Sequence, residues 1–253
     1  MEAPIINNRI EKETIFSPED YLKYKKDIEN KIIPKLSKKC IICFEKSFIN
    51  FLFDKIEKIN WIRDEIQLYS FKEKDMLIAY VNYGGALSTI AVEELIALEV
   101  NEFVVLGSAG SIQKYIVPGS YVIVDKAIRE EGVSYHYMEP SKYVECSEKL
   151  LEKSKKIIQD IDEKIYVGTS WTTDGLYRET IEKVKKYQEE GVFTVDMEAS
   201  SLYSVAKFRN VDFLSIFYIS DSIKELKWNP KFESTNSFKT QSFLIGLALK
   251  ILL

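Results

Sequence analysis

Two acidic segments of the sequence contain the residue types needed to bind a sugar and to assist a leaving group. In the first, the apolar run 192–197 leads into Glu198, at the predicted start of a helix. A carboxylate there could accept hydrogen bonds from a diol while Met197 packs against the sugar face, or it could only complement the helix dipole. In the second, Asp221 closely follows the apolar run 211–219. As a carboxylic acid, Asp221 could protonate a leaving nitrogen, and the alternative is a turn or cap residue.

A third candidate is a run of small residues that could bind an anion. The apolar stretch 103–107 leads into Gly107, Ser108, Ala109, Gly110 and Ser111. In a turn of such residues, backbone N–H groups can converge on an anion with no side chain in the way, and the two serine hydroxyls could add donors. The alternative is an ordinary turn after a strand. The spacing is not that of a P-loop, because no Gly-Lys-Ser/Thr follows.

The composition favours one α/β domain that binds a small ligand. The chain has 253 residues, of which 46% are apolar and 29% charged, and this length fits one large domain better than two small ones. The net charge of −4, with no Lys/Arg block set among aromatic residues, argues against a nucleic-acid surface. No apolar run is long enough to span a membrane, and the N-terminus lacks a basic stretch followed by an apolar one. We therefore expect a cytoplasmic protein without nucleic-acid or membrane partners.

The cysteine and histidine content predicts no metal site. Cys40 and Cys43 form a CxxC pattern within a β-forming run, but a second ligand pair is missing and His136 is the only histidine. We predict that Cys40, Cys43 and Cys146 are buried thiols in a reducing compartment.

Hydrophobic periodicity places the candidate residues on alternating strands and helices. Short runs rich in β-branched residues, typical of buried strands, occur at 39–44, 76–83, 103–107, 120–125, 164–169, 192–197 and 211–219. Helical spacing occurs at 88–98, 147–161, 178–190, 198–208 and 237–253. This is an α/β pattern, in which ligands bind outside the strand ends. Residues 1–38 are predicted to form an N-terminal arm with one helix near 18–30, and residues 39–253 the catalytic domain.

Four motifs, in order along the chain, resemble those of the nucleoside phosphorylase family, which includes purine nucleoside and uridine phosphorylases and the methylthioadenosine/adenosylhomocysteine nucleosidases. They are Tyr83-Gly-Gly-Ala-Leu-Ser-Thr-Ile-Ala-Val-Glu-Glu-Leu95, Gly107-Ser-Ala-Gly-Ser111, Val195-Asp-Met-Glu-Ala199 and Ile219-Ser-Asp221. The resemblance implies a single-domain three-layer αβα sandwich with a mixed central sheet. It implies that 107–111 binds phosphate, that Met197 and Glu198 bind the ribose, and that Asp221 donates a proton or hydrogen bond to N7 of a purine. It implies no metal or organic cofactor, with inorganic phosphate as the co-substrate.

The same comparison indicates a purine-type base. The segment ending in Leu176 and Tyr177 resembles the base-flanking segment of hexameric purine phosphorylases, and the predicted base site comprises Leu176, Tyr177, Val195, Asp196 and Ser220. The loop 132–140 instead resembles that of uridine phosphorylases, which makes His136 a possible ligand contact, although a lone loop histidine is usually solvated. The Gln-x-Arg element that reads uracil is missing, since only Arg178 follows Tyr177.

The arginine residues with which the family's phosphorylases bind phosphate are also missing. These phosphorylases carry an N-terminal Gly-Asp-Pro-x-Arg turn and an Arg two residues before the phosphate-loop glycine. Here the matching strand is Cys40-Ile-Ile-Cys-Phe-Glu-Lys46, and the second position is Val105. Each lost charge-assisted hydrogen bond is worth about 1.5–3 kcal/mol. Another cation would have to substitute, from Arg129, Arg178, Lys46 or a neighbouring subunit.

We therefore expect phosphorolysis of a nucleoside to free base and ribose 1-phosphate by a homo-oligomer, a dimer or hexamer in which a neighbour completes the site. Hydrolysis by water is the main alternative, because the composition of 107–111 is also similar to that of the nucleosidases. A non-catalytic nucleoside-binding or storage protein is the second alternative, and the presence of both Glu198 and Asp221 argues against it.

Overall fold

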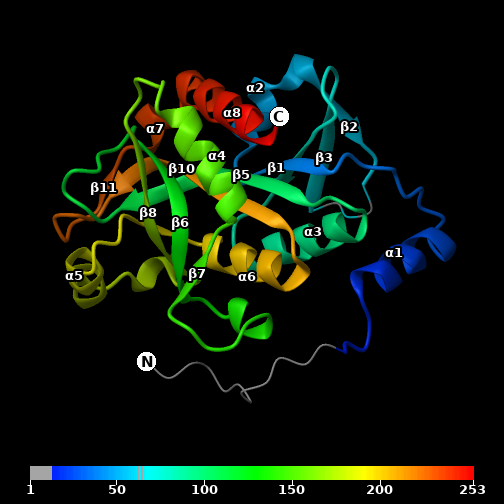
Figure 1. Cartoon of the computed structure of the whole chain (residues 1–253), viewed down its shortest axis with the longest axis horizontal. Coiled ribbons are helices and arrows are strands. Elements are labelled where there is room, and N and C mark those ends of the chain that lie inside the picture. Colours follow the sequence, from blue (N-terminus) through cyan, green and yellow to red (C-terminus); the bar gives the residue numbers. More distant parts are fainter. Residues whose placement is uncertain (1–12, 62, 64) are drawn as a thin grey trace.

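The computed structural model describes residues 13–61, 63 and 65–253, and its centre is one mixed β-sheet (Figure 1). The strands are β1 (Lys39–Cys43), β2 (Ile56–Ile59), β3 (Ile66–Phe71), β4 (Leu77–Val81), β5 (Glu102–Ser111), β6 (Tyr121–Glu130), β7 (Tyr143–Glu145), β8 (Ile165–Thr173), β9 (Thr194–Asp196), β10 (Asp212–Ser222) and β11 (Asn229–Pro230). Their order is β11-β10-β6-β8-β9-β5-β1-β4-β3-β2, and β7 pairs with β6. Strands such as β1 and β10 are apolar and buried along most of their length, as expected for strands covered on both faces.

Part of the sheet closes into a ring. Strand β5 pairs with β9 on one side and with β10 on the other, and β10 returns through β6 and β8 to β9. The pairing of β5 with β10 is parallel and runs from Glu102 opposite Asp212 to Ser111 opposite Ser222. The ring therefore brings the ends of β5, β9 and β10 together, although β9 and β10 lie far from β5 in the sequence.

Helices cover both faces of the sheet (Figure 1). They are α1 (Pro18–Asp27), α2 (Lys46–Phe51), α3 (Gly85–Ala97), α4 (Glu148–Ile158), α5 (Ile181–Glu189), α6 (Ala199–Arg209), α7 (Phe232–Thr235) and α8 (Phe238–Leu252), with short 3-10 helices η1 (Phe53–Lys55), η2 (Ser134–His136) and η3 (Leu176–Arg178). Helix α3 packs against α6 on one face, and α8 packs against α2 and α4 on the other. This confirms the predicted three-layer αβα fold with a mixed sheet.

Local sequence signals explain where several helices begin. The side chains of Ser147, Thr180 and Ser237 each accept a hydrogen bond from a backbone N–H three residues ahead, at the starts of α4, α5 and α8. These hydroxyls satisfy N–H groups that have no partner within the helix. The predicted helix of the N-terminal arm is present as α1, which ends at Asp27 instead of residue 30. Residues 1–12 of the arm lie outside the described residues.

The structure corrects one prediction that concerns the small-residue run. Residues 107–111 do not form a turn after a strand ending at 107, because β5 continues through Ser111. On its β10 side the run is held extended by pairing with Phe217–Ser222, so tertiary contacts override the low β-propensity of glycine. Periodicity also missed the short or peripheral elements β2, β3, β7, β11, α2 and α7.

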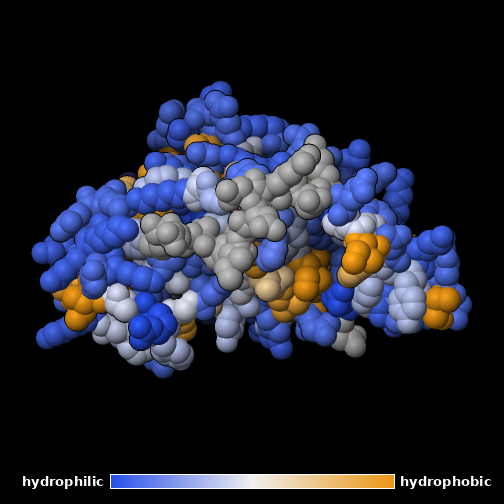
Figure 2. Space-filling model, turned by 90° about the horizontal axis from the view of Figure 1, so that it is seen from below, coloured by the Kyte–Doolittle hydropathy of each residue, from blue (hydrophilic) through white to orange (hydrophobic). Residues whose placement is uncertain are grey.

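The three cysteines are buried and unpaired, as predicted. Within the part of the chain that the structure describes, no helix is long and apolar enough to cross a membrane. Seen from the side of α3 and α6, the surface is mainly hydrophilic, with apolar groups toward the end of the molecule that carries α1 (Figure 2). Exposed apolar side chains in that region include Ile15, Phe16 and Ile28.

Candidate functional site

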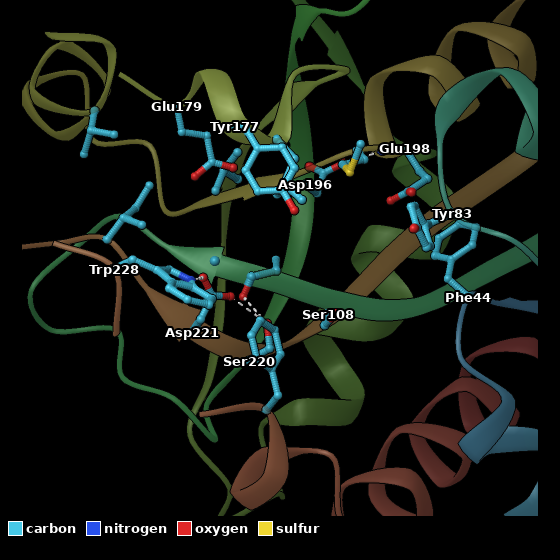
Figure 3. A pocket seen from close by; sticks show the side chains of 18 of the residues that line it. Phe44, Tyr83, Ser108, Tyr177, Glu179, Asp196, Glu198, Ser220, Asp221 and Trp228 are labelled. Carbon is cyan, nitrogen blue, oxygen red and sulfur yellow. Dashed lines mark hydrogen bonds between the residues drawn. The ribbon is translucent and has the colours of Figure 1, made fainter. Parts of the chain in front are cut away.

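A cavity of about 770 Å³ lies where the ends of β5, β9 and β10 meet the start of α6 (Figure 3). Most of the residues predicted for the site line it: Ser108, Ala109, Gly110, Leu176, Tyr177, Val195, Asp196, Met197, Glu198, Ser220 and Asp221. Its size is within the range of about 300–1,000 Å³ that is typical of small-molecule sites. The sequence motifs therefore converge on one cavity, as the ring of strands requires.

Glu198 lies on one wall of this cavity, directly before α6. Its side chain is almost fully buried, and its Oε1 accepts a hydrogen bond of 2.6 Å from the backbone N–H of Gly84. Gly84 has a φ of 108°, a conformation that favours glycine, and it precedes α3. Burial, and then the charge of Asp196, raise the pKa of the Glu198 carboxyl group to about 8. Glu198 is therefore a rigidly held carboxyl group that keeps its proton near neutral pH when no ligand is bound.

Asp196 was predicted to contact the nucleobase, and its side chain mainly accepts hydrogen bonds that stabilise the start of α6. Its Oδ1 accepts hydrogen bonds from the backbone N–H groups of Glu198 at 2.8 Å and Ala199 at 2.7 Å. Its Oδ2 accepts hydrogen bonds from the hydroxyls of Ser170 and Thr172 on β8. These bonds fix the backbone that carries Glu198, so Asp196 positions the neighbouring carboxyl group.

Asp221 lies on another wall, near the end of β10, and a β-bulge directs it into the cavity. Ile219 pairs with Ala109 and Asp221 with Gly110, so Ser220 is an extra residue in the ladder. As a result, the consecutive residues Ser220 and Asp221 both line the cavity, which regular strand alternation would not allow. Asp221 accepts hydrogen bonds from the Ser220 hydroxyl at 2.7 Å and from the Trp228 indole N–H at 3.0 Å.

The small-residue run presents part of a strand edge to the cavity. Leu106 is the last residue of β5 that pairs with β1, and Gly110 is the first that pairs with β9. Between them, Ser108 and Ala109 line the cavity, whereas Gly107 and Ser111 are buried and do not line it. A Cβ atom at Gly110 would lie 3.1 Å from Val195 and 3.4 Å from the Asp221 carboxylate, so glycine allows β5 to approach both walls.

Sequence reasoning missed a carboxyl group beside Ser108. Glu45, two residues after the end of β1, lines the cavity and accepts hydrogen bonds from the Tyr218 hydroxyl at 3.0 Å and the Asn236 amide at 2.7 Å. Burial raises the pKa of Glu45, while the Tyr218 and Ser108 hydroxyls favour its charged form. The available signal was its place as a polar residue after an apolar strand, the position where α/β sheets bind ligands.

Sequence reasoning also missed most of the wall near Asp221. Glu179, between η3 and α5, lines the cavity there, and burial together with the charge of Asp221 raises its pKa to about 7. Two further lining residues that were not predicted, Phe44 and Tyr83, lie on the side of Glu198 (Figure 3). The remaining ones are Ile181, Val184, Ile223, Leu226, Lys227, Trp228 and Phe232. Most of these are apolar, and apolar walls suit a flat, largely apolar group.

The candidate cations of this chain do not lie in the cavity. Arg129 is buried elsewhere and donates to Ser134, Ser141 and two backbone carbonyls. Arg178 and Lys46 are exposed and do not line the cavity, and neither does His136. Among the described lining residues, the exposed Lys227 is the one basic side chain. The described residues also contain no cluster of His, Cys, Asp and Glu that could hold a metal ion.

Comparison with known proteins identifies the family. The sequence matches the family described as "Phosphorylase superfamily" over residues 41–242. The chain belongs to this superfamily. All four motifs that carried the predicted resemblance lie within the matched residues, so that recognition is confirmed.

Several members of the phosphorylase superfamily are similar to this chain. Uridine phosphorylase of Escherichia coli (strain K12) is 26% identical over 182 residues, which cover 60% of this chain and 70% of that protein. A DeoD-type purine nucleoside phosphorylase of Streptococcus gordonii is 27% identical over 207 residues, which cover 78% of this chain and 84% of that protein. Guanosine phosphorylase of Halorubrum lacusprofundi is 28% identical over 138 residues, 54% of this chain and only 57% of that relative.

The fold is also similar to that of a solved structure. The crystal structure of uridine phosphorylase from Vibrio fischeri ES114 superposes with a TM-score of 0.75 and 24% identity, covering 86% of this chain and 92% of that one. This chain therefore has the fold of that uridine phosphorylase.

Proposed function

We propose that this phosphorylase superfamily member cleaves the N-glycosidic bond of a nucleoside with a purine-type base. The observation that carries the proposal is the placement of Glu198 and Asp221 on opposite sides of one cavity, as Figure 3 shows. Glu198 and Met197 bind the ribose, and Asp221 interacts with the base. The apolar lining near Asp221, with Leu176 and Tyr177 at the mouth, holds the base ring. The names of the relatives, which include purine nucleoside and guanosine phosphorylases, support this substrate class.

The two carboxyl groups suit the charges that develop as the bond breaks. The sugar acquires oxocarbenium character and the base acquires negative charge, so an enzyme gains most by interacting with both in the transition state. An ionised Glu198 that binds the ribose hydroxyls lies on the side where positive charge forms. An acid at the other end compensates the charge on the base. The absence of the Gln-x-Arg element favours a purine over uracil.

For the acceptor that attacks the sugar, phosphate is the first candidate. The relatives are named phosphorylases, and the open edge of β5 at Ser108 and Ala109 is the place in this chain where phosphate could bind. Because Lys227 is the one basic residue among the described lining residues, phosphate binding requires cations from a neighbouring subunit of a dimer or hexamer. The exposed apolar residues near α1 are available for such a subunit contact.

A specific observation favours water as a second candidate. Glu45 lies beside Ser108, and carboxyl groups of Glu179, Asp196, Glu198 and Asp221 line the same cavity. A phosphate dianion bound next to Glu45 would be repelled, whereas a carboxylate can hold and deprotonate a water molecule. Hydrolysis would give free ribose in place of ribose 1-phosphate.

The test measures base release from inosine, guanosine, adenosine and uridine, with and without millimolar phosphate, and identifies the sugar product. Cleavage of a purine nucleoside supports the proposal, and ribose 1-phosphate or free ribose as the product decides between phosphate and water. Tight binding of nucleosides without any base release would instead support a non-catalytic binding protein, and would refute the proposal.

A further inference from the structure

Two carboxyl groups lie near each other in the cavity, and they differ in their hydrogen-bond partners. Asp221 accepts one hydrogen bond on each carboxylate oxygen, from Ser220 and from Trp228. Glu179 lies close enough for the charge of Asp221 to act on it, yet its side chain accepts no hydrogen bond and forms no ion pair with the described residues. In Figure 3 both groups lie on the side of the cavity away from Glu198.

The surroundings of the two groups differ. Both oxygens of Asp221 are engaged, one by the Ser220 hydroxyl and one by the Trp228 indole N–H. Glu179 has no such donor and lies among the apolar side chains of the same wall, including Ile181 and Val184. Its burial and the charge of Asp221 raise its pKa to about 7. A buried carboxyl group without a donor favours its protonated form, so Glu179 is the group on this wall that is suited to carry a proton.

We propose that Glu179 is the catalytic acid of the reaction and donates its proton to N7 of the leaving purine, while Asp221 accepts a hydrogen bond from the protonated base. This inference rests on the proposed function. It adds a catalytic residue outside the four sequence motifs, and it changes the predicted part of Asp221 from proton donor to hydrogen-bond acceptor.

Cleavage of the glycosidic bond moves one electron pair and one proton onto the base. As the C1′–N9 bond breaks, its electron pair moves onto the base, and the Glu179 proton moves to N7. The base leaves as a neutral molecule, and Glu179 becomes a carboxylate. The acceptor forms the new bond to C1′, and when it is water, its surplus proton passes to Glu45 and then to solvent. Glu179 takes a proton from solvent after the base has left.

The charges around Glu179 fix the expected pH dependence. Asp221 on β10 is the charged group that acts on Glu179, and it raises the pKa. The other charged residues that line the cavity are Lys227 after β10, Asp196 on β9, Glu198 before α6 and Glu45 after β1. Since the acid must be protonated, turnover of a purine nucleoside should fall as the pH rises through about 7.

The experiment compares Glu179→Gln with wild-type enzyme on inosine and on 7-methylinosine. The methylated base already carries a positive charge and leaves without a proton. In slightly acidic buffer, where the methylated base stays charged, we expect kcat for inosine to fall by about 10²–10⁴-fold and kcat for 7-methylinosine by less than about tenfold. The loss of inosine turnover above neutral pH should disappear in the variant. Glu182→Gln, the same change at an exposed position in the first turn of α5, is the matched control and should behave as wild type.

The ratio of the two rates is measured within one preparation, so partial misfolding of a variant does not affect it. If Glu179→Gln does not fold, Glu179→Asp is used instead, because it keeps a proton donor. The ratio of its kcat for inosine to its kcat for 7-methylinosine should rise toward acidic pH, and this rise tests the same step. Equal losses on both substrates, or no loss on inosine, would overturn the inference while leaving the proposed function standing. A wild-type enzyme that releases base from neither substrate would refute the proposed function itself.

Discussion

The raised pKa of Glu198 predicts that nucleoside binding strengthens with pH. A ribose diol donates hydrogen bonds, so it binds the ionised carboxylate, while burial and Asp196 hold the pKa of Glu198 at about 8. Below that pKa, each pH unit lowers the ionised fraction about tenfold, which costs about 1.4 kcal/mol of binding free energy. We therefore expect Kd to fall about tenfold from pH 6 to pH 7, to fall further toward pH 8, and to level off above it.

The assay is calorimetric titration with a C-nucleoside, whose glycosidic bond cannot be cleaved. At neutral pH, binding should release close to one proton, seen as a dependence of the heat on the ionisation enthalpy of the buffer. A 2′,3′-dideoxy analogue lacks the diol and should lose this pH dependence, and Glu198→Gln should lose it while keeping an acceptor for the Gly84 N–H. A Kd that stays constant between pH 6 and pH 8 would refute the reasoning.

Three further predictions concern the other walls of the cavity. Asp221→Asn should lower kcat for purine nucleosides by about 10–10²-fold with an unchanged Tm, since the amide oxygen can still accept from the Trp228 indole N–H while the amide N–H donates to the Ser220 hydroxyl; full activity would remove Asp221 from the chemistry. Glu45→Gln should abolish most phosphate-independent base release if water is the acceptor, and this is measured as free ribose; release at the wild-type rate would exclude Glu45 as the base. Gly110→Ala should lower the free energy of unfolding by about 1–3 kcal/mol, measured by urea denaturation, and reduce kcat, because the new methyl group presses on Val195 and Asp221. An unchanged urea midpoint and an unchanged kcat would contradict the tight packing at Gly110.

The sequence predicted those parts of the site that are carried by strong local patterns. The apolar run 211–219 identified a buried strand, and the polar residues that closely follow it include Asp221. Glu198 was found in the same way, at the junction of a strand and a helix. These predictions needed only periodicity and motif order, and most of the predicted residues line one cavity.

The remaining features depend on contacts between distant segments. The run 107–111 has the small residues of a turn, and only its pairing with β10 shows that it is a strand. Glu179 follows a short 3-10 helix in a charged segment, where no periodicity marks it as facing Asp221. The place of Glu45 in the site depends on its hydrogen bond with Tyr218, which lies 173 residues away in the chain. Distances of this kind are set by ring closure and cannot be read from spacing.

The closed ring of strands also determines when the cavity can form during folding. Strand β5 is made early in the chain, but its ring partners β9 and β10 begin at Thr194 and Asp212. Until β10 docks, β5 presents the apolar edge Phe103–Leu106 without its parallel partner, and such an edge readily pairs with other chains. Pairing over this sequence distance is slow, since the loop must close before the contacts form. A chain shortened before β10 would thus lose Asp221 and expose an aggregation-prone strand edge at the same time. Docking of β10 therefore both completes the base-binding wall and protects β5 from pairing with other chains.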